Sequence, residues 1–115
     1  MDIGSKGLLN ADLIIPQSTS LNFQVVHKDE SGNVIDHSSC VCNMALQAKD
    51  KTIDLSQCCT PGAQNIAVVI PASVSSGIEL GAYSWDMIVT TTSGDVIRLI
   101  YGKANVVDTY ALDGD

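Results

Sequence analysis

The chain has 115 residues, the commonest size for one domain that buries its own core without metal ions or disulfide bonds. Apolar residues make up 45% of the sequence and aromatic residues only 4%, so the core must consist mainly of aliphatic side chains, which favours β structure. Thirteen acidic residues against six basic ones give a formal net charge of −7, and such a surface argues against direct nucleic-acid binding.

The beginning of the chain has no membrane or export signal. No apolar run approaches the roughly 20 residues that span a bilayer, and MDIGSKGLLN lacks the basic and apolar regions of a signal peptide. We therefore expect synthesis in the cytoplasm and no membrane partner. Residues 1–10 hold Gly, Ser and Asn around the apolar pair Leu8 and Leu9, which predicts a flexible arm that becomes ordered on binding.

Two β-rich runs follow the arm. DLIIPQ is the first, and because Pro16 cannot donate to a ladder, this strand should lie at a sheet edge or bend. SLNFQVVHK alternates apolar and polar residues from Leu21 to Val25, as a strand does. The segment DESGN predicts a hairpin turn into the short run VIDHSS.

The middle of the chain favours further strands. CVCNMALQAK places alternate residues on an apolar and a mixed face, which indicates a strand, although its Met, Ala, Leu and Gln leave a helix open. A short strand is expected at residues 52–55, and NIAVVIP predicts a buried strand that Pro71 stops. ASVSSGIELG is either one helical turn or a loop.

The clearest local pattern is a hairpin. Residues 83–92 and 96–102 are rich in β-branched side chains and flank the turn Ser93-Gly94-Asp95. A last strand is expected at residues 104–110, before an acidic tail at 111–115. Seven or eight short strands without a long helix predict an all-β fold, a single antiparallel β-sandwich over residues 11–110.

Four cysteines, Cys40, Cys42, Cys58 and Cys59, are the sharpest candidates for a metal site, because two thiolate pairs can bind zinc tetrahedrally. Structural zinc sites usually have two residues between paired cysteines, whereas these pairs have one and none. A disulfide across the loop is the other alternative. Free thiols, buried or partly exposed, are the favoured interpretation for a cytoplasmic chain.

Other polar groups give weaker signals. His27 and His37 flank the first hairpin and could meet across it as a metal site or proton relay, but the ordinary interpretation is two solvated side chains. Asp29, Glu30 and Asp36 lack the alternating oxygen ligands of a calcium loop and indicate a solubilising turn. The sequence has no Gly-rich phosphate loop and no Gly-x-Ser-x-Gly elbow, so we expect no enzyme and no cofactor.

The large side chains gather in the C-terminal third: Tyr83, Trp85, Arg98, Tyr101 and Tyr110. These residue types are enriched at interface hot spots. Tyr83 and Trp85 are two residues apart and share one strand face, so one of them is expected in the core.

The C-terminal hairpin resembles a known family. The order G-x-Y-x-W-D at residues 81–86, the turn at Ser93-Gly94 and RLIYGKANV at residues 98–106 are similar to small immunoglobulin-like β-sandwich domains among the structural proteins of tailed bacteriophages. IPQSTSLNFQVVHKDESGNVIDHSSC is similar to their opening, so the resemblance covers about residues 12–108. The family pattern has no set of four cysteines, and it does not include the arm or the tail.

The resemblance implies a virion structural protein without catalysis. Its partners would be capsid, neck or tail proteins, or many copies of itself on a lattice, in a particle assembled in the host cytoplasm. The contacts we expect are Leu8, Leu9, Ile14, the backbone around Pro16, Trp85 and Tyr101. Weak contacts of this kind become effectively permanent when many copies bind one lattice.

Two other functions remain open. A β-sandwich that binds a cell surface or carbohydrate would expose aromatic side chains on one sheet face. A small zinc or redox protein would use the four cysteines, and its stability would depend on metal or oxidation.

Overall fold

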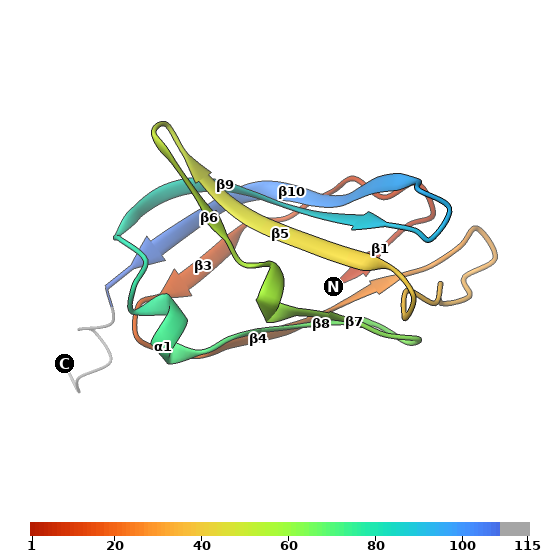
Figure 1. Cartoon of the computed structure of the whole chain (residues 1–115), viewed down its shortest axis with the longest axis horizontal. Helices are drawn as coiled ribbons and strands as arrows, with labels where there is room; N and C mark the ends of the chain where they lie inside the picture. The colour runs from red at the N-terminus through yellow and green to blue at the C-terminus, as the bar shows by residue number, and fades with distance from the viewer. Residues whose placement is uncertain (109–115) are drawn as a thin grey trace.

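The computed structural model describes residues 1–108 and is built from two β-sheets that face each other (Figure 1). The four-stranded sheet has the order β1 (Asp2–Ile3), β4 (Leu21–His27), β8 (Ile66–Ile70) and β7 (Cys59–Pro61). The larger sheet has the order β2 (Leu9–Asn10), β10 (Val96–Val107), β9 (Gly81–Thr90), β5 (Val41–Ala48) and β6 (Lys51–Asp54), and β3 (Leu13–Pro16) also pairs with β10. A 3-10 turn, η1 (Ser56–Cys58), and a short helix, α1 (Ala72–Ser75), complete the described elements.

The core lies between the sheets because each strand presents alternate residues inward. In β5 the inward residues are Cys42, Met44 and Leu46, as the alternation in the sequence predicted. In β9 they are Tyr83, Trp85, Met87 and Val89. Phe23 of β4 and Trp85 pack in a T-shaped arrangement across the core, with ring centroids 6.3 Å apart. The all-β prediction is confirmed.

The hairpin of β9 and β10 is longer than the sequence indicated. β10 continues through Gly102 to Val107, so residues 104–107 belong to the same strand and are not a separate one. A bulge between Arg98 and Ile100 lets both Leu99 and Ile100 face the core. Because the bulge reverses the alternation, the outward side chains beyond it are Tyr101, Lys103, Asn105 and Val107.

The prediction of a single antiparallel sandwich of about seven to eight strands needs two corrections, to the number of strands and to the direction of the N-terminal ones. The described residues form ten strands, and β1 runs parallel to β4 while β2 and β3 run parallel to β10. Both sheets are therefore mixed. The parallel strands all come from the N-terminal segment, which contributes to both sheets before β4 begins.

Residues 1–10 form no separate arm in this structure. Ile3 is only 2% exposed, and the backbone N–H of Val26 donates to the carbonyl oxygen of Met1 at 2.8 Å. Gly7 takes a φ of 72°, and a Cβ there would crowd the carbonyl oxygen of Arg98, so glycine lets the chain pass close to β10. The expected tail at 111–115 lies outside the described residues.

Three further expectations can be compared with the structure. β3 is an edge strand that ends at Pro16, as predicted. β8 is not buried on both faces, since Val69 is 48% exposed on its outer side. ASVSSGIELG contains the single helical turn α1. In the described part of the chain, no helix is long and apolar enough to cross a membrane.

Candidate binding face and the polar clusters

The outer face of the larger sheet carries a row of side chains that runs across its strands. Asp54 of β6 pairs in register with Ala45 of β5, Ala45 with Asp86 of β9, and Asp86 with Tyr101 of β10. Asn10 of β2 continues the row beside Tyr101. The row therefore combines carboxylates, an amide and a phenol around a small alanine.

Asp86, Arg98 and Tyr101 form the charged centre of this face. A guanidinium nitrogen of Arg98 lies 3.6 Å from Oδ2 of Asp86, and its central carbon lies 5.4 Å from the centroid of the Tyr101 ring. The pair is partly solvated, so it positions side chains more than it stabilises the fold. The Arg98 guanidinium therefore lies over an aromatic ring whose residue, Tyr101, is 38% exposed.

Small residues beside this centre leave the face hollowed. A shallow depression is lined by Ala45, Gln47, Ser84, Trp85, Asp86, Arg98, Tyr101 and Gly102. Two neighbouring hollows share Gln47 and Asp86 on one side and Ser84 and Tyr101 on the other, so the three are continuous. We call these residues, except the inward Trp85, together with the Asp54 to Asn10 row, the outer face. It offers hydrogen-bond donors and acceptors around one exposed ring.

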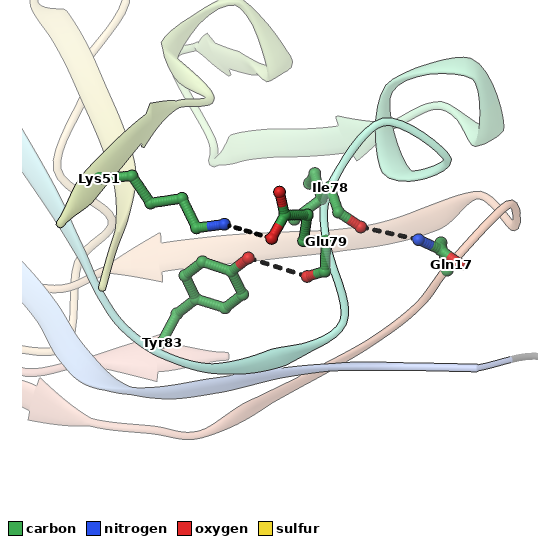
Figure 2. Close-up of polar contacts among 5 residues, drawn as sticks. All are labelled: Gln17, Lys51, Ile78, Glu79 and Tyr83. Atoms are coloured by element: carbon green, nitrogen blue, oxygen red, sulfur yellow. Dashed lines mark hydrogen bonds and ion pairs between the residues drawn. The ribbon is translucent and has the colours of Figure 1, made fainter. Parts of the chain in front are cut away.

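One end of the molecule is closed by the loop after α1 (Figure 2). The hydroxyl of Tyr83 and the side-chain amide of Gln17 donate at 2.8 Å to the carbonyl oxygens of Glu79 and Ile78. Nζ of Lys51 lies 2.8 Å from Oε2 of Glu79, and this bond raises the pKa of Lys51 and lowers the pKa of Glu79. Three separate segments therefore fix the loop.

The predicted contact residues differ in exposure. Leu8 and Ile14 are 58% and 64% exposed, Leu9 and Pro16 are partly exposed, and Tyr101 lies on the outer face. Trp85 is 2% exposed and cannot serve as a contact in this structure. Its side chain shares the inward face of β9 with Tyr83. Tyr110 lies outside the described residues.

The four cysteines are free thiols, and no three of them converge on one point. Cys42 and Cys58 are buried, and Cys40 and Cys59 are partly exposed. A hydrogen bond from Cys59 to Cys42 lowers the pKa of Cys42 and raises the pKa of Cys59, and burial raises the pKa of Cys58. Within residues 1–108 no three His, Cys, Asp or Glu side chains gather in a way that could hold a metal ion.

The two histidines meet, but they are not surface side chains. His27 continues the inward face of β4, His37 precedes β5, and each is 3% exposed. Nδ1 of His27 lies 3.0 Å from Nε2 of His37, with the ring planes 3° apart. The inward alternation of Phe23 and Val25 extends to His27 and was the signal that could have placed it in the core.

Comparisons with known proteins give little. No family model and no curated protein matches the sequence. Among solved structures, the chain is similar to a family 123 glycoside hydrolase from Clostridium perfringens, described for glycolipid glycan hydrolysis, at 13% identity and a TM-score of 0.29. The match covers 89% of this chain and 23% of that enzyme's chain. A likeness at this TM-score carries no argument about function.

Proposed function

We propose that this chain is a non-enzymatic bacteriophage virion structural protein with an immunoglobulin-like fold, which binds the particle in many copies. Strand order supports the fold. If β4 to β10 are read as strands B to G, with β6 as an extra strand C′, one sheet has the order A-B-E-D and the other has G-F-C-C′.

A tyrosine near the start of β9 also supports this fold. The hydroxyl of Tyr83 donates to the backbone four residues earlier, as does the tyrosine in the corner before strand F of immunoglobulin-like domains. Two features depart from that pattern: β1 runs parallel to β4, and Trp85 lies on the strand that would be F. The sequence resemblance adds the virion role.

The observation that carries the assembly proposal is the apolar edge of β3. β3 pairs with β10 alone among the described strands, so its other edge is open. Ile14 projects outward beside it, and Val107 is exposed on the same side of the sheet. Leu8, which is also exposed, precedes β2. A strand from a neighbouring virion protein can pair with this edge and cover these side chains.

The remaining sheet edges are less suited to pairing. β6 begins with Lys51 and ends with Asp54, and charges on an edge strand oppose association. β7 has three residues and ends in Pro61, and β1 and β2 have two each, too few for a stable added strand. The open, apolar edge is therefore specific to β3.

Light scattering and labelling of purified particles with an antibody test this proposal. We expect a monomer or small oligomer in solution and antibody at one position on the virion. Ile14→Asp should abolish incorporation, whereas Val69→Asp, on the outer side of the other sheet, should not. Absence of the protein from particles would refute the virion role, and equal incorporation of both variants would refute the β3 edge.

A second candidate function is a carbohydrate-binding module, which the depression around Asp86, Arg98 and Tyr101 favours. Carboxylate and guanidinium groups can bind adjacent sugar hydroxyls, and a tyrosine ring can cover an apolar sugar face. A glycan array tests it. Binding that Tyr101→Ala removes and Ile14→Asp preserves would favour this function, and no binding to any glycan would exclude it.

A further inference from the structure

A continuous hydrogen-bonded chain connects two loops at the end of the molecule opposite α1. Nε2 of His27 lies 3.3 Å from the carbonyl oxygen of Ser5, Nδ1 of His27 lies 3.0 Å from Nε2 of His37, and Nδ1 of His37 lies 3.5 Å from the sulfur of Cys40. The ring centroids are 5.2 Å apart with nearly parallel planes. The centroid separation equals the 3.0 Å nitrogen–nitrogen distance plus the distance from each ring centre to its nitrogen. The two imidazoles therefore lie nearly in one plane and meet edge to edge.

The direction of the hydrogen bonds follows from the Ser5 end. A carbonyl oxygen only accepts, so His27 donates from Nε2 to Ser5 and its neutral ring accepts at Nδ1. His37 then donates from Nε2 to His27 and accepts at Nδ1. The Cys40 thiol is left as the donor to His37. When both imidazoles and the thiol are neutral, every ring nitrogen of the two histidines has a hydrogen-bond partner.

The same chain accommodates transfer of the thiol proton. If the proton moves from Cys40 to Nδ1 of His37, the imidazolium donates to the thiolate on one side and to His27 on the other, and no hydrogen bond is broken. A nucleophile, a base and a group that orients the base are the parts of an activated thiol. Burial and the neighbouring His27 lower the pKa of His37, against the opposing charge of Asp36. The ring is therefore neutral with a free lone pair at Nδ1, but it is a weaker base than a solvated histidine, and its imidazolium form depends on the adjacent thiolate.

The backbone holds these groups in place. The N–H of Cys40 donates to the carbonyl oxygen of His37 at 2.9 Å, and the N–H of His37 donates to that of Gly62 at 3.1 Å. Asp36 accepts from the N–H of Ser38 at 2.7 Å and fixes the start of the turn. Cys40 is partly exposed and next to the exposed Ser39, so the residue lies at the surface of the protein.

We propose that Cys40 is a reactive thiol that forms mixed disulfides with low-molecular-weight disulfides, with His37 as its base and His27 as a positioning residue. The Cys40 sulfur attacks one sulfur of the disulfide, the reagent S–S bond breaks, and its other half leaves as a thiolate. That thiolate takes the proton held on His37. One thiol and one disulfide thus become a mixed disulfide and a new thiol, with no other oxidant.

Cys59 provides an internal control. It is also partly exposed, but its sulfur lies 3.7 Å from that of Met44 and 3.9 Å from the carbonyl oxygen of Leu55. Its hydrogen bond with Cys42 raises its own pKa, so the pH dependence of the two rates, and not their ratio alone, isolates the contribution of the histidines. The test reacts the native chain with glutathione disulfide and measures the rate at each cysteine by peptide mass spectrometry. We expect Cys40 to react faster than Cys59 by on the order of ten- to a hundredfold. Equal rates in the wild-type chain would overturn the proposal.

The pH profile separates activation from exposure. The rate at an ordinary thiol rises about tenfold per pH unit below its pKa. We expect this slope at Cys59 and a shallower one at Cys40 between pH 6 and 8. The titratable side chains around Cys40 are His37, His27, Asp36 and Cys42, and the carboxylate of Asp36 stays ionised throughout this window. Parallel slopes would mean that the histidines do not activate the thiol.

Two substitutions of one residue test the positioning role. His27→Gln can still accept from His37 and donate to Ser5, whereas His27→Leu can do neither. We expect His27→Gln to keep most of the Cys40 rate and His27→Leu to lose about tenfold, with the Cys59 rate unchanged in both. Loss of the same size in both variants would overturn the role of His27.

Discussion

The indole N–H of Trp85 donates a 2.8 Å hydrogen bond to the carbonyl oxygen of Ala11, which joins the middle of β9 to the segment between β2 and β3. Ala11 in turn donates its backbone N–H to the carbonyl oxygen of Tyr101 at 3.0 Å. The N–H of Lys103 donates to Oδ1 of Asp12 at 3.0 Å. These three hydrogen bonds hold Ala11 and Asp12 of the N-terminal segment close to Gly102 of β10.

Trp85→Phe tests this connection. The variant keeps an aromatic ring against Phe23 but removes the donor to Ala11 and part of the packed volume. We expect a loss of about 2 kcal/mol in the free energy of unfolding, measured by urea denaturation with circular dichroism. Because Trp85 is the single tryptophan, wild-type unfolding should also shift its fluorescence to longer wavelength. An unchanged midpoint would show that the bond to Ala11 contributes nothing.

Gly102→Ala tests the close approach itself. A Cβ at this position would overlap the backbone carbonyl oxygen of Ala11. That oxygen is held in place by the hydrogen bond from Trp85 and by the bond from the N–H of Ala11 to Tyr101. We expect a loss of about 3 kcal/mol in the free energy of unfolding. Gly4→Ala is the matched control, since a Cβ there meets nothing within 4 Å, and it should change stability by less than about 0.5 kcal/mol. Equal effects would contradict the steric argument.

The elements that sequence reasoning located share one property: side-chain alternation that burial enforces. β5 and β9 show it over most of their length, and the turn after β9 has the residues that a tight hairpin requires. β1 and β2 have two residues each and no such periodicity. Backbone pairing with distant strands defines them, and that information is absent from their own residues.

The site residues divide in the same way. Trp85 was expected at an interface because of its residue type, but its position in the alternation of β9 decides its burial. The outer face depends on registers that join Asp86, Arg98 and Tyr101 only after β9 and β10 pair. The contact of His27 with His37 requires the hairpin and the Ser5 turn together. The alternation of β4 could have predicted the burial of His27, whereas His37 lies outside the strands and its burial could not be predicted in this way.

Tyr83→Phe tests the closure of the loop after α1. Tyr83 is buried, with 5% of the residue exposed, and its hydroxyl donates a hydrogen bond to the carbonyl oxygen of Glu79. Removal of the hydroxyl should cost about 1 kcal/mol in the free energy of unfolding by urea denaturation. Tyr101→Phe, on the solvated outer face, should cost much less. The reverse order would mean that the loop is not held by this bond.

The buried histidine pair makes stability depend on pH. The pKa of His37 is lowered, first by burial and then by His27, while Asp36 opposes the shift. The unfolded chain therefore takes up a proton at a higher pH than the folded chain does. The contribution of neutral His37 is complete above the unfolded pKa of about 6.5 and is lost as the pH falls from there to the folded pKa.

Urea midpoints measured from pH 7.5 down to pH 5 test this dependence. We expect the wild-type midpoint to fall with pH in this window and the slope to flatten in His37→Gln, which cannot be protonated. The carboxyls of Asp36 and Asp54 also have lowered pKa values. They affect stability only near and below pH 4, so they do not contribute to a change in the midpoint between pH 7.5 and pH 5. A wild-type midpoint that stays constant or rises toward pH 5 would contradict the burial of a neutral His37.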